Sequence, residues 1–207
     1  MDDTRLTISN ADDLRSLYGE PSDLVKRKAI AKLDKHCRAF IAASPFLVVA
    51  SAGADGSADA SPRGDGPGFV AVLDDATLLI PDRPGNKRID TMENILENPH
   101  VGLIFFVPGM NETLRVNGWA EITTEQALLE PLAVNRKVPQ AGILVRVEEA
   151  YLHCAKALIR SKLWDPETQI DRKTFPTLGQ MIADQIEGVD AETVEERIQE
   201  SYARRLY

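Results

Sequence analysis

The sequence has 207 residues, enough for one domain with a well-developed core. Apolar residues make up 43% and charged residues 27%, which excludes a mainly disordered chain, a collagen-like repeat and a coiled-coil rod. The formal net charge of −8 disfavours general binding to nucleic acids or anionic membranes, but it is compatible with a local basic pocket for a small phosphate.

The N-terminal sequence MDDTRLTISN has neither the basic nor the apolar region of a signal peptide. The longest apolar runs have the length of strands, well short of a membrane helix. The two cysteines, Cys37 and Cys154, lie far apart in the sequence, which fits a reducing compartment. We therefore expect a cytoplasmic protein that neither spans a membrane nor binds nucleic acid.

Residues 1–44 are predicted to form an N-terminal helical segment. Asn10 and Ser22 are plausible N-caps, and Pro21 separates two helical stretches. In the second stretch, four side chains recur on one helical face and are expected to pack on the core: Leu33, Cys37, Phe40 and Ile41.

Six or seven short strands, mostly joined by hairpin-length turns, are predicted to follow within residues 45–165. The expected strands are 46–51, 57–62, 69–73, 77–81, 100–107, 113–122 and 141–150, with short helices near 88–97 and 124–132. Such a series suggests a closed antiparallel barrel. Residues 166–207 are predicted to be a C-terminal helical extension of the same single domain.

Three stretches contain more polar and charged residues than a turn requires. The first is SPRGDGPG (61–68), a rigid Gly/Pro loop whose Arg63 and backbone N–H groups could meet an anion, although a solvent loop is the alternative. The second is DRPGNKRIDT (82–91), where three cations precede a helix start. Cations are unfavourable at that end of a helix, so recruitment of a phosphate would resolve the conflict; a solvated basic turn is the alternative.

The third stretch is ETLRVNGW (112–119). Thr113, Arg115 and Asn117 share one face of the expected strand, which either lines a ligand site or meets water. His36-Cys37 and His153-Cys154 do not have the wider ligand spacing of a structural zinc site, so no metal site is predicted.

The order of these stretches resembles the pyridoxamine 5′-phosphate oxidase-like superfamily of flavin-binding split barrels. The similarity is strongest over GNKRIDTMENILENPHVGLIFFVPGMNETLRVNGWAEI (85–122) and extends over about residues 40–165. The resemblance implies a mainly β fold with flanking helices, built on a six-stranded antiparallel split β-barrel. It also implies flavin mononucleotide (FMN) as cofactor, bound at a homodimer interface.

Carried over by motif, Arg63 resembles the arginine at the start of the first flavin loop. Asn86, Lys87 and Arg88 resemble the basic stretch that binds the flavin phosphate, and Thr113 stands where the authentic oxidases have a flavin-contacting glutamine. Other residues expected around the same pocket are Ser61, Pro62, Gly64, Asp82 and Arg115.

The C-terminal part departs from the authentic oxidases, whose substrate segment contains a Trp and a paired Arg-Leu that could not be placed here. The segment HCAKALIRSKLW (153–164) instead puts His153, Lys156 and Arg160 on one predicted helix face, followed by Trp164. A subgroup of the family carries a similar His-Cys-x-Lys segment, which could close the pocket from either subunit. An amphipathic helix packed on the core is the alternative.

The resemblance thus implies a homodimeric FMN-dependent oxidoreductase that acts on an unknown small-molecule substrate. The missing substrate segment argues against oxidation of the B6 vitamers. No side chain stands out as a proton donor, so no catalytic residue is assigned. Two other hypotheses stay open. One is a non-catalytic binder of FMN, pyridoxal phosphate, haem or deazaflavin, with His153 as the candidate haem ligand. The other is a dimeric scaffold with a degenerate pocket.

Overall fold

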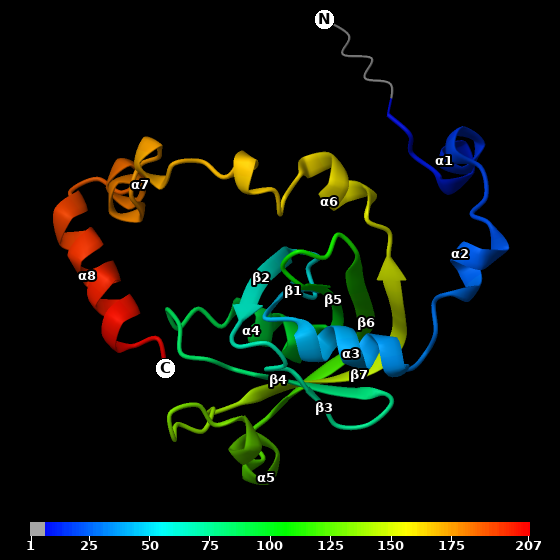
Figure 1. Cartoon of the computed structure of the whole chain (residues 1–207), viewed down its shortest axis with the longest axis horizontal. Coiled ribbons are helices and arrows are strands. Elements are labelled where there is room, and N and C mark those ends of the chain that lie inside the picture. The colour runs from blue at the N-terminus through cyan, green and yellow to red at the C-terminus, as the bar shows by residue number, and fades with distance from the viewer. Residues whose placement is uncertain (1–6) are drawn as a thin grey trace, which may run out of the picture.

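The computed structural model describes residues 7–207 and is organised around one antiparallel sheet (Figure 1). The strands are β1 (Phe46–Ala52), β2 (Ala58–Gly64), β3 (Ala71–Val72), β4 (Thr77–Pro81), β5 (His100–Phe106), β6 (Thr113–Thr123) and β7 (Gly142–His153). They pair in the order β2-β1-β5-β6-β7-β4-β3, so β2 and β3 are the two edges. The mainly β antiparallel fold is confirmed, with seven strands instead of six.

The sheet curls around a core because alternate residues of each strand are apolar. Along β5, for example, Val101, Leu103 and Phe105 are buried while their neighbours are more exposed. The edges do not pair with each other. Instead, Arg63 at the end of β2 and Asp82 just after β4 form an ion pair of 2.9 Å, which bridges the gap between the two ends of the sheet.

A β-bulge sharpens the bend where β6 crosses β7. Asn117 pairs with Glu149 but Gly118 pairs with Val147, so β7 carries one extra residue at this point. A Cβ atom at Gly118 would lie 2.1 Å from the carbonyl oxygen of Arg146, a contact that only glycine avoids. The chain therefore needs glycine here for close approach of the two strands.

The helix α3 (Lys35–Ala43) lies across the strands of the barrel (Figure 1). Its Cys37, Phe40 and Ile41 are buried, as is Leu33 before it, which confirms the predicted apolar face. Asp34 begins the helix by accepting hydrogen bonds from the backbone N–H groups of residues 36 and 37. The Cys37 backbone bond is the main cause that lowers the pKa of the Asp34 carboxyl.

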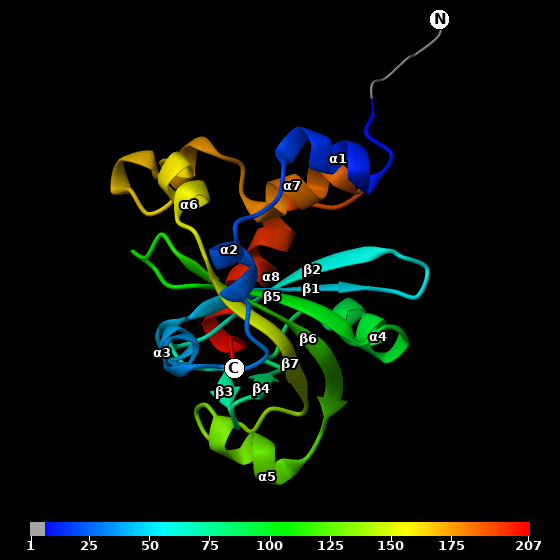
Figure 2. The same cartoon turned by 90° about the vertical axis from the view of Figure 1, so that its right-hand side faces the viewer.

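The other helices lie around the barrel. They are α1 (Ala11–Tyr18), α2 (Asp23–Arg27), α4 (Asp90–Glu97), α5 (Gln126–Leu129), α6 (Lys156–Ser161), α7 (Leu178–Gln185) and α8 (Ala191–Arg204). The predicted N-caps Asn10 and Ser22 precede α1 and α2, although only the Asn10 side chain makes a capping bond. Figures 1 and 2 show α1 and α7 on the same side of the barrel, away from the sheet.

Two predicted elements differ from the structure. The strand expected at 69–73 is reduced to the two residues of β3, because Phe69 and Val70 turn into the core instead of pairing. The last strand runs on to His153, three residues beyond its predicted end, because β6 pairs with it along its whole length.

Candidate functional site

A cleft of about 1260 Å³ opens where the barrel is split. Its walls come from β2, the end of β4, the β4–α4 loop, the first turn of α4 and residues 134–140. Eight residues predicted from the sequence line it: Ser61, Pro62, Arg63, Gly64, Asp82, Asn86, Lys87 and Arg88. The first two polar stretches of the sequence therefore meet in one cavity.

Arg63 is largely enclosed, with a side chain that is 17% exposed. One terminal nitrogen donates to Asp82 at 2.9 Å, while its Nε atom is buried and has no hydrogen-bond partner among the described residues. A buried N–H without an acceptor destabilises a protein unless a ligand or water satisfies it. An anionic oxygen in the cleft would supply that acceptor.

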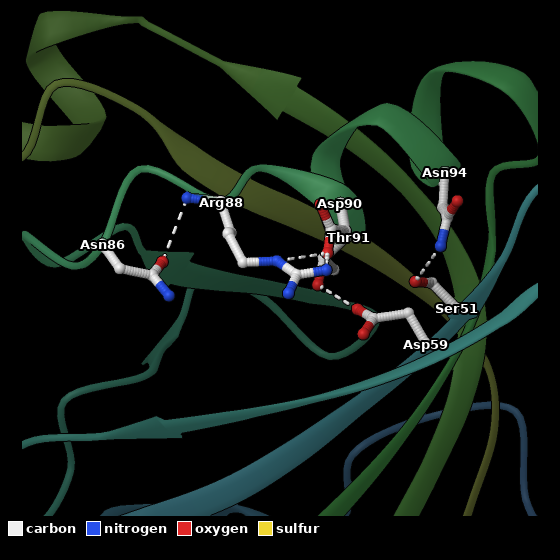
Figure 3. A network of polar contacts seen from close by, with 7 residues as sticks. All are labelled: Ser51, Asp59, Asn86, Arg88, Asp90, Thr91 and Asn94. Carbon is white, nitrogen blue, oxygen red and sulfur yellow. Dashed lines mark hydrogen bonds and ion pairs between the residues drawn. The ribbon is translucent and has the colours of Figure 1, made fainter. Parts of the chain in front are cut away.

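The basic loop before α4 carries two cations that line the cleft, Lys87 and Arg88, and Figure 3 shows the contacts of Arg88. The Arg88 guanidinium donates to Asp90 through Nε at 2.9 Å and Nη2 at 2.6 Å, so its charge is largely compensated. Lys87 makes no ion pair within residues 7–207 and has a left-handed backbone with φ of 65°. Backbone strain in a non-glycine residue is common at ligand-binding loops, which singles out Lys87.

Side-chain hydrogen bonds fix this loop and α4 to the sheet (Figure 3). The Asn86 side chain accepts a bond from the backbone N–H of Arg88 at 3.0 Å. The Thr91 hydroxyl donates to Asp59 of β2 at 2.7 Å, and Asn94 donates to a serine of β1 at 3.1 Å. The cations at the rim of the cleft thus stand on a rigid support.

The sequence analysis missed a second polar cluster beside the cleft. Arg83 donates from Nε to Asp65 at 2.6 Å, and Lys137 and Tyr207 line the same cavity. Burial raises the pKa of the Asp65 carboxyl, but hydrogen bonds from Tyr207 and Gly66 and the charge of Arg83 outweigh burial, so the pKa is lowered overall. Arg83 was visible in the basic stretch, whereas nothing in the sequence linked Tyr207 to it.

The third polar stretch lies outside this cleft. The predicted alternation is confirmed over residues 114–117, since Arg115 and Asn117 are partly exposed between buried apolar neighbours. Thr113, Arg115 and Asn117 of β6 pair with His153, Tyr151 and Glu149 of β7 in that order. Arg115 lies 5.4 Å from the centre of the Tyr151 ring, and Thr113 is only 2% exposed. None of these residues lines the cleft of its own chain.

The prediction that His153, Lys156 and Arg160 share a helix face is wrong. His153 is the last residue of β7, and only Lys156 and Arg160 belong to α6. Trp164 follows this helix and donates from its indole nitrogen to the backbone oxygen of Met110 at 2.7 Å. None of the four predicted residues lines the cleft, so their assignment to a ligand site stays a prediction.

Comparison with known families decides the classification. The family model described as pyridoxamine 5′-phosphate oxidase matches residues 33–154, which is more than half of the chain. The chain belongs to this family. The matched range contains every strand and the whole split of the barrel, so the pyridoxamine 5′-phosphate oxidase-like split-barrel fold is confirmed.

Solved structures with a similar fold include HupZ of Group A Streptococcus and an FMN-binding protein of Syntrophomonas wolfei. HupZ is 22% identical, with a TM-score of 0.48, over 57% of this chain and 92% of its own. The Syntrophomonas protein is 10% identical, with a TM-score of 0.48, over 69% of this chain and 96% of its own. No curated protein matches the sequence.

The described residues contain neither a membrane-spanning helix nor a metal cluster. No helix within residues 7–207 is both long and apolar enough to cross a membrane. In the same range, no group of three or more His, Cys, Asp or Glu side chains is placed to hold a metal ion.

Proposed function

We propose that this member of the pyridoxamine 5′-phosphate oxidase family is an FMN-binding oxidoreductase, with the phosphate of FMN bound in the cleft at the split of the barrel. The observation that carries the proposal is Arg63, which lines the same cavity as Lys87 and Arg88 and whose buried Nε lacks an acceptor among the described residues. A phosphate dianion supplies several acceptor oxygens to such a group.

The cleft residues fit the cofactor in charge and in rigidity. Lys87 makes no ion pair among the described residues, and Arg63 is held by Asp82 through one terminal nitrogen while its buried Nε has no acceptor. Asp82 positions Arg63 before a ligand arrives, and the loop that carries Lys87 leads into α4, which Thr91 and Asn94 fix to the sheet. Bound FMN supplies the redox chemistry, while this chain binds and orients it.

An absorption spectrum tests the proposal. The purified protein is incubated with FMN and desalted, and flavin absorbance that stays with the protein is the expected result. Arg63→Met is the matched variant, since it keeps the apolar stem but removes every donor, and it is expected to lose the colour on desalting. A wild-type protein that retains no FMN would refute the proposal.

We also propose that the protein acts as a homodimer whose subunits share the site. The β6–β7 face with Arg115 and His153 does not line the cleft of its own chain, although the family resemblance assigns both faces to the flavin. The segments outside the barrel expose large apolar side chains that a second subunit could cover: Leu14, Leu17, Tyr18, Leu24, Phe175 and Ile186.

Mixed dimers distinguish a shared site from two separate ones. Lys87→Met and Arg115→Ala are each expected to impair FMN binding, and a mixed dimer of the two variants would contain one intact site. Recovered binding in the mixture supports the shared site. A monomer by sedimentation, or no recovery after subunit exchange, would contradict it.

A further inference from the structure

Three basic side chains gather around one tyrosine ring on the β6–β7 face. The Nζ atom of Lys28 lies 5.5 Å from the centre of the Tyr151 ring, and the central guanidinium carbon of Arg115 lies 5.4 Å from it. The centre of the His153 ring lies 6.5 Å from that of Tyr151. A cation within about 6 Å of an aromatic ring is attracted to the face of the ring. We call Lys28, Arg115, Tyr151 and His153 the Tyr151 cluster.

Backbone pairing places the members of the cluster. Arg115 lies opposite Tyr151 in the register of β6 and β7. Lys28 follows α2, and the backbone of the nearby Ile30 exchanges two hydrogen bonds with β7, of 3.0 and 2.7 Å. The Lys28 ammonium also donates to the backbone oxygen of Leu152 at 2.9 Å. The three chain segments that form the cluster are therefore joined before a ligand arrives.

The positive charges of the cluster have no acidic partner within residues 7–207. Arg115 is half-buried, and its contact with the Tyr151 ring is not accompanied by a hydrogen bond or an ion pair in this range. Glu149 lies on the same strand face, but its carboxylate accepts a hydrogen bond from Asn117 at 2.8 Å and pairs with none of the cations. By contrast, several other arginines each pair with an aspartate: Arg38, Arg63, Arg83 and Arg88.

This arrangement has the chemistry of an oxyanion site. A guanidinium group presents a planar fork of N–H donors that matches a carboxylate or phosphate, and the Lys28 ammonium adds a second positive charge. Cations that share one ring repel each other, so an anion bound between them lowers the electrostatic energy. The chain as a whole has a net charge of −8, which makes this local excess of positive charge a particular feature of the β6–β7 face.

The FMN phosphate of the proposed function is assigned to a different place. It occupies the cleft, and none of the four residues of the Tyr151 cluster lines the cleft. FMN has a single phosphate group, and its oxidised ring has no formal charge. In the proposed dimer the β6–β7 face completes the flavin site of the other subunit. An oxyanion bound to the cluster would therefore belong to the molecule that meets the flavin.

We propose that the substrate of this protein is a small anionic molecule whose carboxylate or phosphate group binds to the Tyr151 cluster. Arg115 and Lys28 bind the oxyanion, and Tyr151 positions both cations. The assignment of the anion to a substrate rests on the proposed function, whereas binding of the anion is measured without flavin.

The side-chain NMR signals of the three histidines, His36, His100 and His153, report on anion binding. The protein without flavin is titrated at constant pH with sodium phosphate and with sodium acetate, each against sodium chloride of equal ionic strength. The His153 signals are expected to shift and saturate, while the other two histidines respond as in chloride. Tighter binding of phosphate indicates a phosphorylated substrate, and equal or tighter binding of acetate indicates a carboxylate substrate. A His153 response no larger than in chloride would overturn the proposal.

Lys28→Met and Arg115→Met test whether the cluster is responsible for the response. Each is expected to raise the Kd read from the His153 signals about tenfold or more, because a hydrogen bond to a charged group is lost. Lys26→Met is the matched control, since it removes a positive charge from the adjoining α2, where the ammonium pairs with Glu20 at 3.3 Å. Thermal unfolding checks that each variant is folded. Equal Kd values in all four proteins would overturn the proposal.

A titration of the FMN-saturated protein separates the substrate from the flavin. The anion that binds more tightly is expected to shift the His153 signals also when FMN is bound. If FMN abolishes this shift, the cluster binds the flavin itself, and the proposal is overturned. If the protein retains no FMN, the proposed function fails, and the titrations without flavin alone decide whether the Tyr151 cluster binds an oxyanion.

Discussion

Removal of the Lys87 charge is expected to weaken FMN binding far more than removal of the neighbouring Arg88 charge. The two cations are adjacent in sequence and line the same cleft, but their surroundings differ. Asp90 compensates Arg88 through two hydrogen bonds, and the Arg88 side chain is 75% exposed. Lys87 has no such partner within the described residues.

The structure sets the size of each effect. A hydrogen bond to a charged group contributes about 1.5–3 kcal/mol, so Lys87→Met is expected to raise the Kd for FMN by about 10–150-fold. The exposed Arg88–Asp90 pair has no net charge and attracts an anion weakly, so Arg88→Met is expected to change the Kd by less than about threefold. Asp90→Asn frees Arg88 and is expected to tighten binding.

Quenching of flavin fluorescence measures these dissociation constants, and thermal unfolding without FMN checks that each variant is folded. Repeating the titrations at high ionic strength should shrink the Lys87 effect, because salt screens an exposed charge. A larger loss for Arg88→Met than for Lys87→Met would refute the reasoning, since it would mean that the Asp90 ion pair opens in the complex.

Three further predictions concern the fold. Gly118→Ala is expected to cost more than about 2 kcal/mol of unfolding free energy in a urea titration, because its Cβ would meet the Arg146 oxygen at 2.1 Å; Gly85→Ala, with no atom within 4 Å, should cost little. Asp34→Ala should cost about 1 kcal/mol near neutral pH. The pKa of this carboxyl is lowered in the folded protein, so the difference in unfolding free energy between wild type and Asp34→Ala should vanish as the pH falls through that pKa. A difference in unfolding free energy that persists in strong acid would contradict the capping role. Burial raises the pKa of Cys37 to about 11. A maleimide at about pH 7 should therefore modify only one of the two thiols in the native protein and both thiols in urea. Modification of both thiols in the native protein would argue against a buried Cys37.

Local patterns predicted most of the fold. The apolar face of α3 and the alternation along β6 were readable because each repeats with the period of its element, and the structure confirms both. The end of β7 was not readable, since His153 continues the strand only because Thr113 of β6 lies opposite it. Pairing with β6 sets the C-terminal end of β7, so this end could not be predicted from the sequence of β7 alone.

The site residues that could be predicted are those that lie together in one short stretch of sequence. Arg63, Lys87 and Arg88 stand in stretches whose Gly, Pro and cation content exceeds what a turn needs, and all three line the cleft. Tyr207 could not be found in this way, because its contact with Asp65 joins residues 142 positions apart. The compensation of Arg88 by Asp90 was also hidden, since adjacent opposite charges are common on solvated helix ends.

The edge strand β2 has a consequence for solubility as well as for the site. An unpaired strand edge invites a strand of another molecule to add to the sheet, which leads to aggregation. Pro62 stands within β2 and has no N–H to offer such a strand, and Asp59 and Arg63 place two charged side chains on the same edge strand. The residues that border the cleft thus also protect the protein against edge-to-edge polymerisation, and substitutions that make β2 more apolar to improve ligand packing would carry a risk of fibre formation.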